Sequence, residues 1–314
     1  MVTEIGARAL SRAAHYREQK NPESTVLAYS RDVERYIDWC AKAGFTAFPA
    51  SPVVVGAYLA EHGAGFAYNT LVRWVAGIAW RARRDGEPLD TKAPEITEVL
   101  NGIGLVEGTK ARRAAAVTTD EMALVVSKLG ADLTGLRDRA LLLVGFGAAL
   151  RRSELAALDV SDVHWTDIGL ELTIDRSKTD QKRQGATVAV VRGQNPETCA
   201  VSALRTWLER AKIENGPLFR KVARGGHVQE KPLTGGAIWK IVTARFRAAK
   251  LTAPKDEYLS PHSLRAGFVT SAYVNDASDE EIMHQTRHKS LTTMRGYVRR
   301  AKLRAGGASG KVGL

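Results

Sequence analysis

Several segments of this sequence combine arginine, histidine and tyrosine side chains at spacings that suit phosphate chemistry. In the first segment, an apolar run ends abruptly at Arg151 and Arg152, and Glu154 follows two residues later. An arginine at the end of an apolar helix is costly to bury unless it meets an anion. A bound phosphate would provide that anion, and an ion pair between Arg151 and Glu154 is the structural alternative.

Two further segments carry candidate acid–base and nucleophilic groups. In the segment PHSLR, His262 and Arg265 are three residues apart. Both side chains are therefore expected on one face at a helix N-terminus, where partial positive charge favours an anion. In the segment HKSLTTMRGY, Tyr297 lies nine residues after His288 in a basic helix. Taken singly, these residues are equally well explained as surface groups and a core tyrosine.

Other chemistries find little support in the sequence. There is no GxxxxGK(S/T) loop, which argues against a P-loop nucleotide site. Cys40 and Cys199 are the only cysteines and lie far apart in the chain, so neither a disulfide framework nor a cysteine-based zinc site is expected. His284 and His288 have the i, i+4 spacing of two metal ligands, but no HExxH glutamate accompanies them and Lys289 follows. We therefore expect no metal and no cofactor.

The charge of the chain is strongly positive and unevenly distributed. Lysine and arginine number 46 and aspartate and glutamate 34, a formal net charge of +12 over 314 residues. Residues 1–116 hold 15 basic and 13 acidic side chains, a net of +2, whereas the remainder holds 31 and 21, a net of +10. This excess indicates a polyanionic partner, either nucleic acid or an acidic membrane surface. A merely solvated basic surface is the alternative.

The sequence argues against secretion and membrane insertion. The first ten residues include Glu4 and lack the apolar run of a signal peptide. The most apolar stretch, residues 140–150, is too short to cross a bilayer. We expect a cytoplasmic, nucleoid-associated protein with no membrane partner.

The elements that must position these groups fall into two domains. The first domain, residues 1–108, reads as a bundle of helices, of which residues 1–20 are expected to be flexible. Apolar residues recur there at helical spacing between proline, asparagine and glycine boundary signals. The predicted helices cover residues 21–44, 51–63, 69–86 and 96–103.

A basic linker over residues 109–117 leads into the second domain, residues 118–304. A capping box at Thr118 and Glu121 starts its first helix. Period-2 stretches at 169–174 and 186–191 predict two strands joined by the polar turn SKTDQKRQG. Cap and turn signals predict further helices from residue 195 onward and over 234–250, 260–273, 278–284 and 290–303. The tail, 305–314, is too poor in apolar residues to order itself. The expected fold is mainly α with a small antiparallel β-sheet.

Four segments together carry a family resemblance that none of them carries alone. The segments ALRRSEL, RSKTDQ, HSLR and IMHQTRHKSLTTMRGYVR occur in the order typical of tyrosine recombinases. The chain resembles this phage integrase family over nearly its full length, in the simple Cre or Xer-like form. The resemblance implies a helical N-terminal domain that clamps DNA and an α-rich catalytic domain. The catalytic residues that it implies are Arg151, Lys178, His262, Arg265, His288 and Tyr297, supported by Glu154.

The resemblance also implies a role for each of these groups. The two arginines would grip one phosphodiester, which suits the planar, permanently charged guanidinium. Tyr297 would be the nucleophile, and His262 would assist its deprotonation. Lys178, in the turn between the two strands, would protonate the departing 5′ oxygen. His288 would support the leaving side of the phosphate.

The implied reaction makes a 3′-phosphotyrosine intermediate and a Holliday junction, and it needs neither ATP nor a metal. The implied partners are double-stranded DNA with inverted-repeat half-sites and a homotetramer on two DNA sites. Little chain precedes the predicted bundle, so we expect no additional arm-site DNA-binding domain. Basic side chains near these motifs are further candidates for DNA contact: Lys110, Arg112, Arg113, Arg152, Lys182, Arg183, Arg287 and Lys289.

Two positions depart from the family pattern, and two other functions stay open. Ala149 and Arg287 each occupy a position where the family commonly has glycine. The glycine before His288 ordinarily permits a tight turn, so Arg287 bears on how that histidine is placed. The alternative functions are relaxation of DNA by a type IB topoisomerase-like enzyme and non-catalytic regulation by DNA binding.

Overall fold

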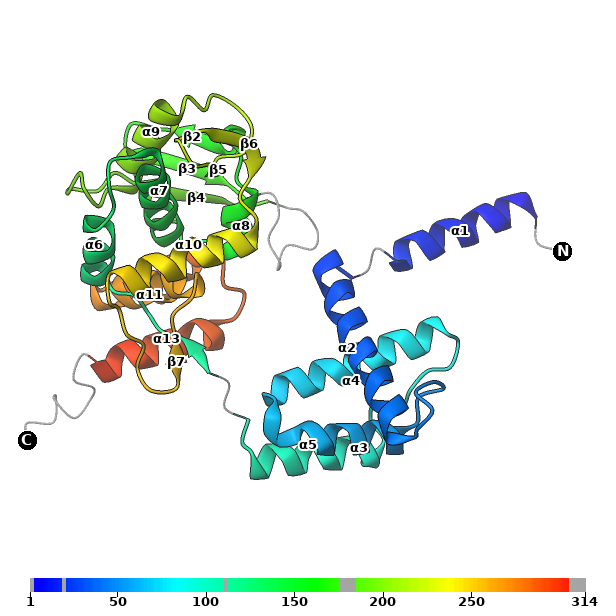
Figure 1. Cartoon of the computed structure of the whole chain (residues 1–314). Helices are drawn as coiled ribbons and strands as arrows, with labels where there is room; N and C mark the ends of the chain where they lie inside the picture. The colour runs from blue at the N-terminus through cyan, green and yellow to red at the C-terminus, as the bar shows by residue number, and fades with distance from the viewer. Residues whose placement is uncertain (1–2, 19–20, 110–111, 175–184, 305–314) are drawn as a thin grey trace, which may run out of the picture. The chain divides into compact units, whose positions relative to one another are not determined.

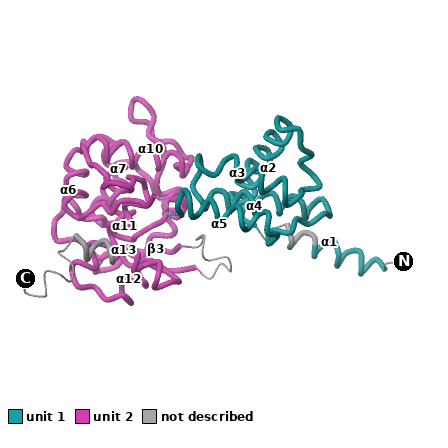
Figure 2. The backbone as a smooth tube through the Cα atoms, turned by 90° about the horizontal axis from the view of Figure 1, so that it is seen from below, with its two compact units in different colours: residues 1–111 teal, residues 112–314 magenta. Residues whose placement is uncertain are grey.

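The computed structural model describes residues 3–18, 21–109, 112–174 and 185–304 of the chain. It divides into two compact units, residues 1–111 and 112–314, which Figure 2 distinguishes by colour. The structure therefore places the division within the predicted linker, close to the predicted domain boundary.

The first unit is built from helices whose aromatic and aliphatic faces meet in one core. The pairs α2 with α4 and α3 with α5 pack against each other, and Tyr36, Tyr58 and Trp74 are fully buried between them. The helices are α1 (Glu4–Glu18), α2 (Glu23–Ala43), α3 (Pro52–His62), α4 (Tyr68–Arg84) and α5 (Pro94–Val106), with a 3-10 turn at Gly63–Gly65.

The four predicted helices of this unit are confirmed, with boundaries shifted by a few residues. Residues 4–18, within the segment expected to be flexible, form the helix α1. Alanine, arginine and glutamate have high intrinsic helix propensity, so this segment is helical although most of its described side chains are exposed.

The second unit surrounds the buried helix α7, against which α9 and α11 pack (Figure 1). Its largest core side chains include Leu141, Trp207 and Phe246, all fully buried. The helices of this unit are α6 (Thr119–Ser127), α7 (Leu133–Gly147), α8 (Arg152–Ala157), α9 (Ala200–Ala211), α10 (Gly235–Ala248), α11 (His262–Val274), α12 (Asp279–Thr286) and α13 (Leu291–Arg304). A 3-10 turn, Val160–Asp162, follows α8.

The predicted capping box at Thr118 is present and begins α6. The helix predicted from residue 195 begins later, at Ala200. There the Cys199 sulfur accepts a hydrogen bond from the Ser202 amide and caps the helix.

Small sheets complete the second unit. The predicted strand pair is confirmed as β3 (Gly169–Thr173) and β4 (Thr187–Val191), which pair antiparallel with Leu172 opposite Val188. A third strand, β2 (Val163–Trp165), extends this sheet in the order β2-β3-β4, and β5 (Arg220–Val222) pairs with β6 (Val228–Pro232). Sequence periodicity did not predict β2, β5 or β6, because three to five residues with mixed exposure carry little alternation. The predicted turn residues 175–184 lie outside the described residues.

The second half of the predicted linker is built into the second unit. Strand β1 (Arg113–Ala114) pairs parallel with β7 (Glu257–Tyr258), and the side chains of Ala115 and Val117 are buried. Helix α11 approaches this segment so closely that a Cβ atom on Gly267 would lie 1.9 Å from the Val117 carbonyl oxygen. The segment thereby fixes the N-terminal half of α11. The predicted tail, residues 305–314, lies outside the described residues.

Within the described parts of the chain, we find no helix with the length and apolar character needed to span a bilayer.

Candidate active site

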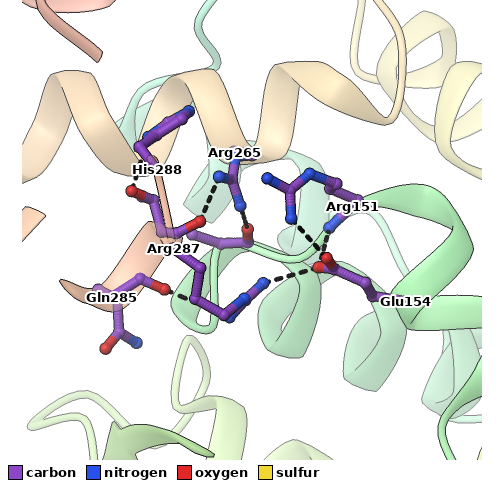
Figure 3. A network of polar contacts seen from close by, with 8 residues as sticks. Arg151, Glu154, Arg265, Gln285, Arg287 and His288 are labelled. Carbon is purple, nitrogen blue, oxygen red and sulfur yellow. Dashed lines mark hydrogen bonds and ion pairs between the residues drawn. The ribbon is translucent and has the colours of Figure 1, made fainter. Parts of the chain in front are cut away.

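Arg151 lies at the start of α8, where the chain leaves the buried helix α7. The turn passes through Ala149, whose φ of 48° is in the left-handed region. The Arg151 backbone N–H donates to Glu154 Oε2 at 2.8 Å, and Arg151 Nη1 donates to Glu154 Oε1 at 2.6 Å (Figure 3). The Glu154 carboxylate therefore caps α8 and at the same time orients the Arg151 guanidinium. The structural ion pair that the sequence left open is present, and it uses one of the five guanidinium N–H groups.

Arg265 lies beneath this turn and is 1% exposed. It projects from the first turn of α11, donates through Nη1 to the Ala149 carbonyl at 2.7 Å, and donates through Nη2 to the Thr286 carbonyl. Burial, followed by the charges of Arg151 and Arg287, lowers the pKa of Arg265 to about 9. Arg265 thus remains cationic at neutral pH and ties α11 to the ends of α7 and α12.

Arg287, a candidate for DNA contact in the sequence, is mostly buried and contacts Glu154. Its backbone adopts φ 56° and ψ 40° at the end of α12, which is the conformation that a glycine would adopt most easily. The side chain is 11% exposed, and Nη2 donates to Glu154 Oε2 at 2.7 Å (Figure 3). Arg151, Glu154, Arg265 and Arg287 form one network, which we call the guanidinium cluster.

Glu154 is the only carboxylate of the guanidinium cluster. Burial alone would raise its pKa, but the Arg287 charge and the hydrogen bonds from Arg151 outweigh that effect and hold the pKa below its ordinary value. Three cationic guanidiniums against one carboxylate leave the cluster with a net charge of +2. Such a local excess favours binding of an anion.

His288 follows Arg287 in the turn between α12 and α13. The Thr286 hydroxyl donates to the Ile282 carbonyl at 2.6 Å and lies 2.7 Å from His288 Nδ1. Because the single hydroxyl hydrogen is already donated, Nδ1 must carry the hydrogen in the second bond and Nε2 is left with a lone pair in the neutral ring. Burial, then the nearby Arg265 and Arg151 charges, lowers the His288 pKa to about 3. The ring is therefore neutral at pH 7.

Tyr297 and His262 make direct contact across two helices. His262 is the first residue of α11, and its Nε2 lies 2.6 Å from Tyr297 Oη on α13. Met294 and Val298 hold α13 against α11 and α12 in a small apolar core. The ring of His288 also lies near Tyr297, with centroids 6.0 Å apart. This arrangement places a tyrosine hydroxyl within hydrogen-bonding distance of an imidazole nitrogen.

A pocket of about 490 Å³ opens beside these two residues. Arg112 and Arg113, both predicted DNA contacts, contribute to its wall, and Arg112 Nη2 donates to the Glu257 carbonyl at 2.9 Å. The lining residues are Arg112, Arg113, Ala114, Tyr258, His262, Thr292, Thr293, Gly296 and Tyr297. The pocket is therefore lined by two arginines together with His262 and Tyr297.

The structure describes only some of the remaining predicted site residues. Arg152 and Lys289 are exposed. Four predicted residues lie outside the described residues: Lys110, Lys178, Lys182 and Arg183. The described part of the chain contains no group of three His, Cys, Asp or Glu side chains that could hold a metal ion.

Gln285 and Thr286 contribute to the site, although the sequence did not single them out. Gln285 Nε2 donates to the Ala189 carbonyl of β4 at 2.8 Å and to the Gly147 carbonyl at 3.0 Å. It thereby ties α12 to β4 and to the end of α7. Its partners are backbone carbonyls 96 and 138 residues away, so no sequence signal identifies the contact.

Comparison with known proteins assigns the second unit of the chain to one family. The phage integrase family pattern covers residues 115–304, which contain every described residue of the guanidinium cluster as well as His262 and Tyr297. This chain belongs to the phage integrase family. The predicted resemblance is confirmed, and the chain is a tyrosine recombinase of the Xer-like type.

Individual relatives support this assignment. A protein of Selenomonas ruminantium named integrase/recombinase xerD homolog is 32% identical over 291 residues, which cover 91% of this chain and 84% of the relative. Tyrosine recombinase XerD of Corynebacterium glutamicum is 27% identical over 300 residues, 88% of this chain and 87% of the relative. Among solved structures, the post-cleavage complex of XerH site-specific recombinase on palindromic difH substrate matches with a TM-score of 0.64 and 17% identity, over 88% of this chain and 77% of that one. This last similarity confirms the predicted fold class.

Proposed function

We propose that this tyrosine recombinase cleaves and rejoins double-stranded DNA at specific sites through a 3′-phosphotyrosine at Tyr297. The observation that carries the proposal is the 2.6 Å contact between Tyr297 Oη and His262 Nε2, in a unit that also holds the +2 guanidinium cluster. A hydroxyl next to a base suits nucleophilic attack, and the cluster suits the phosphate that is attacked.

In the proposed step, Tyr297 Oη attacks the phosphorus atom of one phosphodiester while its proton passes to His262 Nε2. The Oη–P bond forms, the P–O5′ bond breaks, and the strand leaves as a 5′ hydroxyl after taking up a proton, for which we propose Lys178 as the donor. Rejoining is the reverse attack by a 5′ hydroxyl on the phosphotyrosine. One phosphoester bond is exchanged for another, so the chemistry balances without a nucleotide cofactor or an oxidant.

The arginines are proposed to bind the non-bridging oxygens of the same phosphate. Arg151 keeps 19% of its side chain exposed and four N–H groups outside its bond to Glu154. Arg265 has five N–H groups, of which two are donated to backbone carbonyls. A phosphate beside His288 would raise the pKa of that ring and favour its protonated, donating form. Loss of one such donor costs about 10²- to 10³-fold in rate.

The proposed assembly is a homotetramer on two DNA sites that exchanges strands through a Holliday junction. The first unit would clamp DNA with the second, and each site would contain inverted-repeat half-sites. Two observations support this proposal: the palindromic substrate named for the XerH complex and the basic excess of residues 117–314. Arg112, Arg113, Arg152 and Lys289 are the described side chains proposed for DNA contact, together with Lys110, Lys182 and Arg183.

The proposal is tested with DNA flanking the gene for this protein. Footprinting identifies a bound segment, and a duplex of that segment is nicked just 3′ of the cleavage position so that the short released fragment diffuses away. A 5′ label on the cleaved strand should then migrate with the protein in denaturing gels, whereas a 3′ label should not. Tyr297→Phe should bind the duplex and give no adduct. Tyr273→Phe, on α11 beside the same small apolar core, should give as much adduct as the natural protein.

Three results would overturn parts of the proposal. An adduct from Tyr297→Phe would refute the nucleophile. Relaxation of a two-site plasmid without any strand-exchanged product would favour a topoisomerase-like enzyme. Footprinting without an adduct from the natural protein would favour a non-catalytic regulator.

A further inference from the structure

Arg287 occupies an energetically unfavourable position. It is a non-glycine residue with φ 56°, a conformation that L-residues with a side chain rarely adopt. Its guanidinium is mostly buried, and the Nε atom is buried without a hydrogen-bond partner among the described residues. Strain of this kind persists where the surrounding structure requires it, and it concentrates at functional sites.

The contact that Arg287 makes leads directly to Arg151. Glu154 Oε2 accepts from Arg287 Nη2 at 2.7 Å and from the Arg151 backbone N–H at 2.8 Å, while Oε1 accepts from Arg151 Nη1 at 2.6 Å. Both arginines therefore share one carboxylate (Figure 3). Arg287 also donates through Nη1 to the Gln285 carbonyl at 3.3 Å, which fixes its side chain over the end of α12.

Sharing the Glu154 carboxylate between two arginines changes the net charge of the guanidinium cluster. Without Arg287, Glu154 would be matched by Arg151 alone, and Arg265 would leave the cluster with a net charge of +1. With Arg287, the net charge is +2. A phosphodiester carries one negative charge, and it gains a second when a tyrosine that has lost its proton attacks it. A cluster of +2 is therefore better matched to the transition state than to the bound DNA.

We propose that Arg287 is a positioning residue for strand cleavage. It holds the Glu154 carboxylate in a shared ion pair, so that Glu154 orients Arg151 without cancelling its charge toward the phosphate. The inference rests on the proposed function of the site, because it assigns Arg287 to the stabilisation of the same phosphoryl transfer.

The test compares binding with single-turnover cleavage on the nicked duplex described above. Arg287→Gly suits the left-handed backbone and should bind DNA within about twofold of the natural protein, because most affinity comes from many other phosphate contacts. Its cleavage rate constant at saturating DNA should fall at least about tenfold, less than the ~10²- to 10³-fold loss expected for a direct donor. Arg287→Lys keeps the positive charge and should retain most of the rate. The matched control is Arg295→Ala, which removes an exposed arginine of α13 that pairs with Asp279 of α12 and keeps a good helix former; it should leave the rate unchanged.

Rescue by the conservative variant separates this role from a merely structural one. Arg287→Lys keeps a long side chain at the strained φ of 56°, so it retains the rate that Arg287→Gly loses only if the positive charge beside Glu154 is what cleavage requires. A rate of Arg287→Gly equal to that of the natural protein, or an Arg287→Lys rate as low as that of Arg287→Gly, would overturn the inference. Failure of the natural protein to form any adduct would instead overturn the proposed function.

Discussion

Replacing Glu154 with glutamine should strongly destabilise the second unit. The Glu154 side chain is 0% exposed and accepts hydrogen bonds from the Arg151 amide, from Arg151 Nη1 and from Arg287 Nη2. Glutamine removes the negative charge and leaves three guanidiniums facing one another. Removing one partner of a buried ion pair costs about 3–5 kcal/mol. Because the amide oxygen can still accept from one arginine, we expect a loss near the lower end, ~3 kcal/mol.

The assay is urea unfolding of the full chain, with amide hydrogen exchange in peptides from α7 and α11 as the readout. These peptides report on the second unit alone. The matched control is Asp279→Asn, which removes the carboxylate of a partly exposed pair with Arg295. Exposed pairs contribute up to about 1 kcal/mol, so the control should change the free energy of unfolding by no more than that.

The pH dependence provides an independent check of the same reasoning. The pKa of Glu154 is lower in the folded protein than in the unfolded chain. Its ionised form therefore stabilises the fold above the ordinary value of about 4.3, and this contribution is lost as the pH falls through the lower folded value. The difference between the natural protein and Glu154→Gln should shrink below about pH 4. A loss at pH 7 no larger than that of Asp279→Asn would refute the buried-charge argument.

Three further predictions concern packing and protonation. Gly267→Ala should destabilise the second unit by about 1–3 kcal/mol, because the new Cβ atom would lie 1.9 Å from the Val117 carbonyl oxygen. The control is Gly236→Ala on α10, where the new Cβ atom would make only an ordinary contact. In the same urea assay it should change the free energy of unfolding by no more than about 1 kcal/mol. Gly56→Ala should lower the unfolding midpoint of the first unit, since its Cβ would meet a carbonyl oxygen of α5 at 2.3 Å, and an unchanged midpoint would contradict this packing. The folded His288 ring has a pKa of about 3, so between pH 6.5 and 3 only the unfolded ring takes up a proton and stability should fall with falling pH, by up to about 1.4 kcal/mol per pH unit. His288→Gln should weaken this pH dependence of stability. Identical pH profiles of the natural protein and the variant would contradict a neutral, buried His288 ring.

Short-range patterns in the sequence were sufficient for helices α2 to α5, for several helices of the second unit and for one strand pair. The boundaries of α2 to α5 follow prolines, glycines and apolar repeats that lie within a few residues of one another. The capping boxes at Thr118 and Ser278 are both formed, because each needs only a hydroxyl and a glutamate three residues apart. The same locality explains what was missed: the three residues of β2 carry too little alternation to be distinguished from a loop.

The order of the motifs by itself predicted the family, which the comparison confirms, and it selected the residues proposed to react. It did not determine how those residues meet. The contact between His262 and Tyr297 joins residues 35 positions apart, and it exists only because α13 packs against α11. Arg287 is the sharper case, since the sequence made it a candidate for DNA contact because it is a basic residue next to a motif. In the tertiary structure this side chain points inward and pairs with Glu154, because a buried carboxylate must be paired with a positive charge. Glu154 lies 133 residues away in sequence, so no local pattern could predict the pair.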